Sequence, residues 1–165
     1  MQTKEIQKVL VANRGEIAIR IFRACHDLGI HTVAIYSNED TCSLFRTRAD
    51  EAYLVGEKKS PLGAYLDIPR IIELAKKHGA DAIHPGYGFL SENADFAERV
   101  EKSGFVFIGP RSESIRIMGD KVTAKQAMIK AGIPCVPGSD GALSDDPQEI
   151  ISVARKIGFP VIIKA

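Results

Sequence analysis

Short apolar segments alternate with longer helical patterns from residue 8 to residue 108, and this alternation constrains the fold more than any other feature. Apolar, β-branched segments predict strands, whereas apolar residues at helical spacing predict helices between them. Strands that are joined through helices pair in parallel, and a parallel sheet needs helices on both faces. We therefore expect an α/β fold with a Rossmann-like parallel sheet, whose strands are Lys8–Asn13, Ile30–Tyr36, Ala52–Val55, Ala82–His84 and Phe105–Ile108.

Each helix between these strands is expected to bury one apolar face. The first helix runs from Gly15 to Leu28, and Gly29 follows as its stop. Its expected apolar face comprises Ile17, Ile21, Ala24 and Leu28. A later helix begins near Pro69 and stops at Gly79. Its expected apolar face comprises Ile68, Ile71, Ile72 and Ala75.

The pattern changes after residue 110. Two helical segments, Ser112–Met118 and Asp120–Ala131, follow each other without an obvious strand between them. Residues 132–147 are rich in Gly, Pro, Ser and Asp, which is typical of a connector or an active-site loop. One more helix is expected from Pro147 to Gly158, with the Asp145–Asp146 pair as its cap.

The last five residues, Val161–Ala165, read as the start of a buried strand. A new strand–helix unit that stops in its first strand is a poor end for a domain. We therefore expect a fragment with two parts, a Rossmann-like domain over residues 1–131 and a connector with the truncated start of a second domain over residues 132–165.

Composition excludes several classes of function. Lysine and arginine number 22 and aspartate and glutamate 21, so the net charge of +1 gives no general attraction to nucleic acid or to an anionic membrane. No apolar run approaches the roughly 20 residues that cross a bilayer. The three cysteines and four histidines lack the spacing of a disulfide framework or a metal site. A cytoplasmic protein without a metal site of its own is expected.

The segment Ala12–Ile17 joins the first strand to the first helix. A dinucleotide-binding fold carries GxGxxG at this turn, where glycines let the backbone approach a pyrophosphate. Here only Gly15 remains, while Arg14 and Glu16 add bulk, which argues against NAD. On spacing alone, a tight turn with a polar helix start is the favoured interpretation. The turn nevertheless follows a parallel strand at its carboxyl end, where open α/β sheets bind ligands.

The most informative motif is HPGYGFLSEN, which follows the strand that ends at His84. Its proline and two glycines fix an unusual backbone path and bring main-chain N–H groups close to any ligand. An imidazole, a phenol and a carboxylate surround that path, at His84, Tyr87 and Glu92. The alternative is a structural turn with an inert, hydrogen-bonded histidine. The density of glycines, aromatic groups and ionisable groups favours a binding loop.

Two lysines are candidates for binding an anion such as phosphate. Lys121 lies in the first turn of an expected helix, where positive charge opposes the helix dipole. Taken alone, a solvated surface lysine is the favoured interpretation of this residue. Lys164 follows three apolar residues in what reads as a buried strand. Because lysine is rarely buried without a partner, Lys164 is interpreted as a phosphate or nucleotide ligand.

Six runs in this chain occur in the same order in biotin carboxylases, and the chain resembles that family over nearly its whole length. Residues 35–56 are more similar to pyruvate carboxylases than to the acetyl-CoA enzymes. The six runs are VANRGEIAIRIFRAC (Val11–Cys25), AIHPGYGFLSEN (Ala82–Asn93), FIGP (Phe107–Pro110), MGDKVTA (Met118–Ala124), PGSDG (Pro137–Gly141) and FPVIIKA (Phe159–Ala165).

The resemblance implies an ATP-grasp ligase that forms a C–N bond. Its N-terminal Rossmann-like domain would correspond to residues 1–131, and its ATP-grasp domain would begin in the connector and continue past Ala165. Such enzymes activate bicarbonate with MgATP through carboxyphosphate and carboxylate N1 of biotin on a carrier domain. The expected partners are therefore the remainder of the biotin carboxylase domain and a biotin carboxyl carrier domain.

The resemblance also assigns roles to individual residues. Lys121 and Lys164 correspond to two lysines that contact ATP. The HPGYG loop corresponds to a wall of the biotin and bicarbonate pocket, so Tyr87 and Gly88 are stronger candidate contacts than His84, and Glu92 is weaker.

Charged residues on one side of the first helix are either a solvated face or a polar subunit interface. The family's dimer-forming helix lies at this position, so the resemblance favours a homodimer interface. The three residues are Arg20, Arg23 and Asp27.

Several parts of the family's active site do not occur in these 165 residues. They are the glycine-rich lid, the Mg²⁺-binding glutamates, the arginines and lysine around bicarbonate, and the carboxylate proposed as general base. We therefore assign no catalytic residue and no metal ligand to this chain, and expect it to be inactive alone. The alternatives are the biotin carboxylase subunit of an acetyl-CoA carboxylase, and a non-catalytic dimerisation or scaffold module. A carbamoyl-phosphate or purine-pathway ligase is disfavoured by the VANRGEIAIR and HPGYGFLSEN runs.

Overall fold

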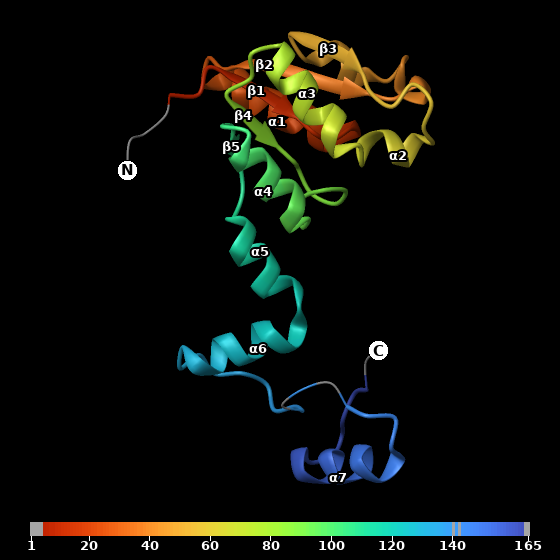
Figure 1. Cartoon of the computed structure of the whole chain (residues 1–165), viewed down its shortest axis with the longest axis vertical. Helices are drawn as coiled ribbons and strands as arrows, with labels where there is room; N and C mark the ends of the chain where they lie inside the picture. The colour runs from red at the N-terminus through yellow and green to blue at the C-terminus, as the bar shows by residue number, and fades with distance from the viewer. Residues whose placement is uncertain (1–4, 140, 142, 164–165) are drawn as a thin grey trace. The chain divides into compact units, whose positions relative to one another are not determined.

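The computed structural model describes residues 5–139, 141 and 143–163. Five parallel strands form one sheet in the order β3-β2-β1-β4-β5 (Figure 1). This order confirms the predicted Rossmann-like α/β fold, because the chain extends the sheet first to one side of β1 and then to the other. The strands are β1 (Lys8–Val11), β2 (His31–Tyr36), β3 (Glu51–Leu54), β4 (Ala82–His84) and β5 (Val106–Phe107).

Helices follow the strands as the sequence predicts, with one short helix, α2, and two 3₁₀ turns in addition. Local capping explains where several of them begin. Asn93 accepts a hydrogen bond from the Phe96 amide at 2.8 Å and so begins α4. The helices and 3₁₀ turns between the strands are α1 (Gly15–Asp27), η1 (Asn38–Asp40), η2 (Leu44–Arg48), α2 (Pro61–Tyr65), α3 (Ile68–Lys77) and α4 (Ala94–Lys102).

Two apolar clusters cover the two faces of the sheet. Successive residues of β1 point to opposite faces, so Val9 and Val11 join one cluster and Leu10 joins the other. The first cluster contains the buried side of α1 with Phe22, and the second contains α3 and α4 with Phe96. The predicted sheet with helices on both faces is therefore confirmed.

The apolar face expected for α1 is wrong in part. The residues that α1 buries are Ala18, Ile21, Phe22 and Cys25, whereas Ala24 is exposed and Leu28 is 74% exposed. The helix carries apolar residues around much of its circumference, so spacing alone does not select a face, and the sheet decides which residues are buried. For α3 the expected face is correct, with Ile71, Ile72 and Ala75 buried and Ile68 packed against them.

The second part of the chain contains α5 (Ser112–Gly119), α6 (Lys121–Lys130) and α7 (Pro147–Ile157). Asp120 caps α6 by accepting from the Thr123 amide at 2.7 Å, and Asp146 caps α7 by accepting from the Gln148 amide at 3.0 Å. The chain divides into two compact units, residues 1–115 and 116–165. A unit that is compact within this chain need not coincide with a domain of a longer protein, so the boundary after residue 131 stays a prediction.

The buried strand expected over Val161–Ala165 is wrong for the residues that the structure describes. Residues 161–163 form no strand, and Ile162 and Ile163 are 83% and 70% exposed. A strand exists only when a neighbour accepts and donates its main-chain hydrogen bonds, and residues 161–163 have no such neighbour within the described chain. Lys164 and Ala165 lie outside the described residues.

Candidate functional site

The turn after β1 and the loop after β4 lie next to each other at the carboxyl edge of the sheet. Val11 and His84 are register partners, and the Ala12 amide donates to the His84 carbonyl at 2.8 Å. β1 is the strand at which the order of the sheet reverses, since its neighbours are β2 and β4. Ligands of open α/β sheets bind at such a reversal, outside the carboxyl ends of the strands. The NRGE turn and the HPGYG loop therefore form one candidate site.

Asn13 joins the two segments. Its side chain is buried, and its amide nitrogen donates to the carbonyls of Pro85 at 2.7 Å and Tyr87 at 2.8 Å. Its side-chain oxygen accepts from the Arg14 amide at 2.8 Å. The role of Asn13 was not predicted from the sequence of this turn. The available signal was an amide residue directly after a buried strand, a position where a side chain can satisfy loop carbonyls.

The path of the HPGYG loop requires its glycines. Gly86 and Gly88 have φ angles of 66° and 65°, in the left-handed region. A Cβ at Gly86 would lie 2.7 Å from the Asn13 amide nitrogen, whereas a Cβ at Gly88 would have nothing within 4 Å. Phe89 also has a positive φ, of 42°, which is uncommon for a side-chain-bearing residue. The packing against Asn13 and the loop's own hydrogen bonds hold this conformation.

His84 contributes to the same path. Its Nδ1 accepts a hydrogen bond from the Gly86 amide at 3.0 Å, and burial lowers the pKa of the imidazole. A neutral ring with an unprotonated Nδ1 is the form that accepts this bond. Nδ1 of His84 is therefore occupied by a hydrogen bond from within the loop.

Tyr87 presents its side chain at the surface of the site. It is 60% exposed, and its phenol donates to the Glu16 carboxylate at 2.5 Å. This hydrogen bond raises the pKa of the Tyr87 phenol. Gly88 and Glu92 are exposed further along the loop. The structure thus brings Tyr87, Gly88 and His84 together with the first turn of α1.

An ion pair between the half-exposed Arg14 and the buried Asp40 also supports the turn. Asp40 is 2% exposed and accepts from Arg14 Nε at 2.6 Å and from the Tyr65 hydroxyl at 2.6 Å. The bond from Arg14, opposed by burial, lowers the pKa of Asp40 to about 2. The Tyr65 ring stacks on Phe89, with centroids 5.3 Å apart. Arg14 is therefore bound to Asp40 and is a structural element of the site.

The two predicted lysine ligands are described only in part. Lys121 is the first residue of α6, and nothing further is described for its side chain. Lys164 lies outside the described residues.

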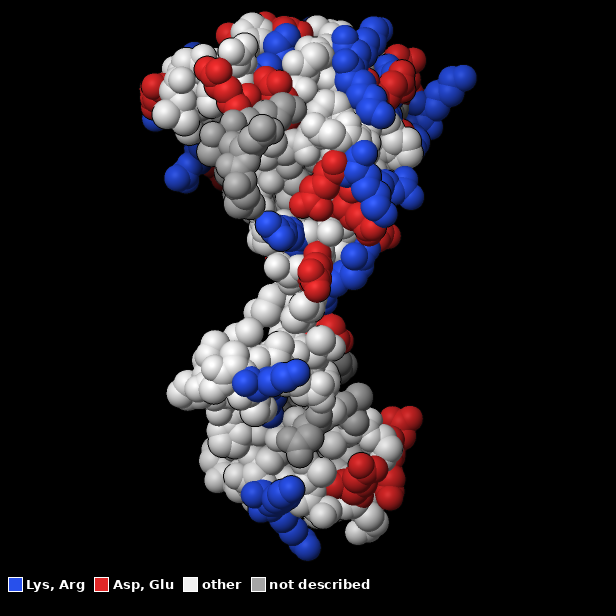
Figure 2. Space-filling view, turned by 60° about the vertical axis from the view of Figure 1, so that its left-hand side comes forward, with Lys and Arg blue, Asp and Glu red and all other residues white. Residues whose placement is uncertain are grey.

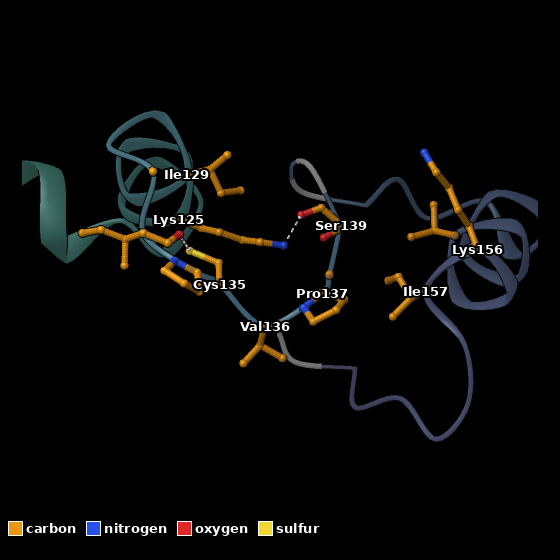
Figure 3. A pocket seen from close by; sticks show the side chains of 13 residues that line it. Lys125, Ile129, Cys135, Val136, Pro137, Ser139, Lys156 and Ile157 are labelled. Atoms are coloured by element: carbon orange, nitrogen blue, oxygen red, sulfur yellow. Dashed lines mark hydrogen bonds between the residues drawn. The ribbon is translucent and has the colours of Figure 1, made fainter.

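The second unit has a cavity of about 780 Å³ that was not predicted from the sequence (Figure 3). Lys125, one turn after Lys121, lies in it and donates to the Ser139 carbonyl at 3.2 Å, and Lys156 lines it from α7. Apolar side chains such as Ile133 and Ile157 form other walls.

Charged side chains of both signs are exposed on the described chain. Arg20, Arg23 and Asp27 are all exposed on α1. Figure 2 shows basic and acidic side chains interspersed on the face in view, in keeping with the net charge of +1. Within the described residues, no three His, Cys, Asp or Glu side chains gather where they could hold a metal ion. No described helix has the length and apolarity that a membrane span requires.

Comparison with known proteins identifies the family. The family model for the biotin carboxylase N-terminal domain matches residues 5–115. A second family model, for the ATP-binding domain of the carbamoyl-phosphate synthase L chain, matches residues 120–165. Pyruvate carboxylase of Bacillus subtilis is 59% identical over 165 residues, which are 100% of this chain and 14% of the relative. Biotin carboxylase of Pseudomonas aeruginosa is 57% identical over 160 residues, 97% of this chain and 35% of the relative.

A solved structure agrees with these relatives. The biotin carboxylase domain dimer of Hydrogenobacter thermophilus 2-oxoglutarate carboxylase, in complex with MgADP, ADP and bicarbonate, superposes with a TM-score of 0.87 at 51% identity. The match covers 96% of this chain and 34% of that one. This chain thus spans only 14% to 35% of the length of these relatives. Because the family model matches residues 5–115 and the Rossmann-like sheet is present, the chain belongs to the biotin carboxylase family and corresponds to the N-terminal part of a biotin carboxylase.

Proposed function

We propose that this chain is the N-terminal part of an ATP-dependent biotin carboxylase within a pyruvate carboxylase. The complete enzyme activates bicarbonate with MgATP and carboxylates N1 of biotin on a carrier domain. The observation that carries the proposal is that the match to a pyruvate carboxylase, at 59% identity, extends over all 165 residues, whereas a biotin carboxylase of the same identity matches over 160. The 57% identity with a biotin carboxylase supports the carboxylation step but leaves an acyl-CoA as the alternative final acceptor.

In this proposal the carboxyl edge of the sheet forms one wall of the acceptor pocket. Tyr87 and Gly88 contact biotin or bicarbonate, because they are exposed on a loop whose backbone Asn13 holds in place. His84 shapes the loop through its bond from the Gly86 amide, and Glu92 lies at the margin. None of these residues is assigned a proton-transfer step.

The second unit contributes to ATP binding. Lys121 and Lys164 contact the phosphates, and the family match over residues 120–165 supports this assignment. Lys125 and Lys156 in the neighbouring cavity add positive charge to that unit. The residues that bind Mg²⁺ belong to another part of the enzyme in this proposal, as the resemblance to biotin carboxylases implies.

Two further features belong to the proposal. The exposed side of α1 with Arg20, Arg23 and Asp27 forms a homodimer interface, supported by the dimer of the related 2-oxoglutarate carboxylase domain. The enzyme acts in the cytoplasm, together with the remaining part of its biotin carboxylase domain and a biotin carboxyl carrier domain.

Bicarbonate-dependent ATP cleavage with free biotin tests the proposal. The 165-residue chain alone is expected to show no turnover, whereas a protein in which this chain continues into a complete biotin carboxylase is expected to be active. Fixation of labelled bicarbonate with pyruvate or with acetyl-CoA then identifies the acceptor. Robust turnover by the isolated chain would contradict its assignment as one part of the active site.

A further inference from the structure

Tyr87 is held at both ends by a single turn of the chain. Its carbonyl accepts from the buried Asn13 side chain at 2.8 Å, and its phenol donates to Glu16 at 2.5 Å. The glycines on either side, at φ of 66° and 65°, set the direction in which its side chain leaves the loop. Main chain and side chain are thus both anchored to residues 13–16.

The backbone of Glu16 is held in place by its position in α1. It lies in the first turn of the helix, where a carboxylate interacts favourably with the helix dipole. Ala18, Ile21 and Phe22 on the same helix are buried against the sheet and fix the helix in position. A carboxylate on such a helix limits the rotation of the phenol that it binds.

The ring of Tyr87 stays open to solvent although its hydroxyl is bound, since the side chain is 60% exposed. The charged groups that act on the phenol come from α1. Glu16 raises its pKa, and Arg20 opposes that effect. The geometry therefore holds an aromatic face in one orientation at the carboxyl edge of the sheet. An aromatic face fixed before binding suits a planar, uncharged group, because the side chain loses little further freedom.

We propose that Glu16 is a positioning residue, which orients the Tyr87 ring against the planar ureido ring of biotin. This inference rests on the proposed function, in which Tyr87 contacts the acceptor. Glu16 itself touches neither substrate nor reacting atoms in this assignment. Its effect is on acceptor binding through Tyr87.

The test compares variants in the complete biotin carboxylase that contains this chain. Glu16→Ala is expected to raise the KM for free biotin about two- to tenfold, the cost of ordering one released side chain on binding. The KM for ATP is expected to stay unchanged. Glu16→Gln keeps an oxygen that accepts from the phenol and is expected to retain most of the wild-type KM for biotin. Glu101→Ala, an exposed glutamate on α4, is the matched control.

A double-mutant cycle separates positioning from a general structural effect. Tyr87→Phe already lacks the hydroxyl, so adding Glu16→Ala to it is expected to leave the KM for biotin as in Tyr87→Phe alone. Ultraviolet titration of tyrosinate in the 165-residue chain gives a spectroscopic readout. Without Glu16, the phenol of Tyr87 is expected to ionise at lower pH, with Tyr87→Phe identifying its signal.

An unchanged KM for biotin in Glu16→Ala overturns the positioning role. If Tyr87→Ala still raises that KM, the proposed function stands without it. If Tyr87→Ala also leaves the KM unchanged, the contact between the loop and biotin is wrong, and the role of Glu16 is rejected with it.

Discussion

The two compact units of this chain differ in how far their apolar side chains are buried. In residues 1–115, strands β1, β2, β4 and β5 contribute buried residues to the two apolar clusters, and partly buried residues of β3 pack against them. Large side chains such as Phe22 and Phe96 are at most 1% exposed. In residues 116–165, Val136, Phe159 and Ile162 are 85%, 73% and 83% exposed. Helix α7 is amphipathic in sequence but has no buried residue. The first unit thus satisfies its own core, while the second presents apolar surface of the kind that interactions with other protein usually cover.

The largest expected effect concerns this difference in packing. Phe96→Ala removes a fully buried ring that packs edge-on against Phe107, and is expected to lower the free energy of unfolding by about 3–5 kcal/mol. Ile151→Ala in α7 removes a 42% exposed side chain and is expected to cost less than about 1 kcal/mol. Urea unfolding of both variants measures the contrast. Equal losses would show that the second unit is as tightly packed as the first.

The next prediction concerns the polar connection at the carboxyl edge. Asn13→Asp keeps the size of the side chain but replaces a donor with an acceptor, which leaves the Pro85 and Tyr87 carbonyls without their partner. A loss of stability of about 2–3 kcal/mol is expected. The matched change in the second unit is Asp120→Asn, where asparagine caps a helix as well as aspartate does. Denaturant midpoints that fall equally for both variants would contradict the role given to Asn13.

A smaller effect separates the two glycines of the loop. Gly86→Ala and Gly88→Ala both place a side chain at positive φ, so they share the same backbone strain. Only the first adds a methyl group 2.7 Å from Asn13. Gly86→Ala is therefore expected to be less stable than Gly88→Ala by about 1–3 kcal/mol. Thermal unfolding of the pair measures this difference, and the reverse order would show that Asn13 does not determine the loop's path.

The smallest expected effect is the dependence of stability on pH through Asp40. Its folded-state pKa of about 2 is below the ordinary value of 3.8, so its contribution is complete above about pH 5 and is lost as pH falls through 2. Because Arg14 is half exposed, we expect a contribution of about 1–2 kcal/mol. Glu51 and Asp50 also have pKa values of about 2, so the difference between wild type and Asp40→Asn isolates this carboxylate. An identical loss of stability between pH 4 and pH 2 in both proteins would exclude the ion pair as its source.

The fold could be predicted from the sequence more completely than the site. The alternation of strands and helices predicted the parallel sheet. The spacing of apolar residues predicted the buried face of α3, because these residues lie on a single side of that helix. The face of α1 did not follow, because apolar residues surround much of that helix. In the site, the HPGYG loop was identified from its glycines and ionisable groups, but Asn13 was missed. An amide residue directly after a buried strand can satisfy loop carbonyls, but its partners could not be identified, because the carbonyls of Pro85 and Tyr87 lie more than 70 positions away in the sequence.

The sequence by itself determined the order of strands and of the helices between them, a helix cap within the Asp145–Asp146 pair, and the family to which the chain belongs. These depend on local patterns and short motifs, which act within a few residues of each other. The tertiary structure alone decided that residues 13–16 hold a loop more than 70 positions away, and that Arg14 binds Asp40. It also decided that residues 161–163 stay outside any strand. A parallel sheet brings distant strand ends to one edge, and a strand forms only where a neighbour is present to pair with it.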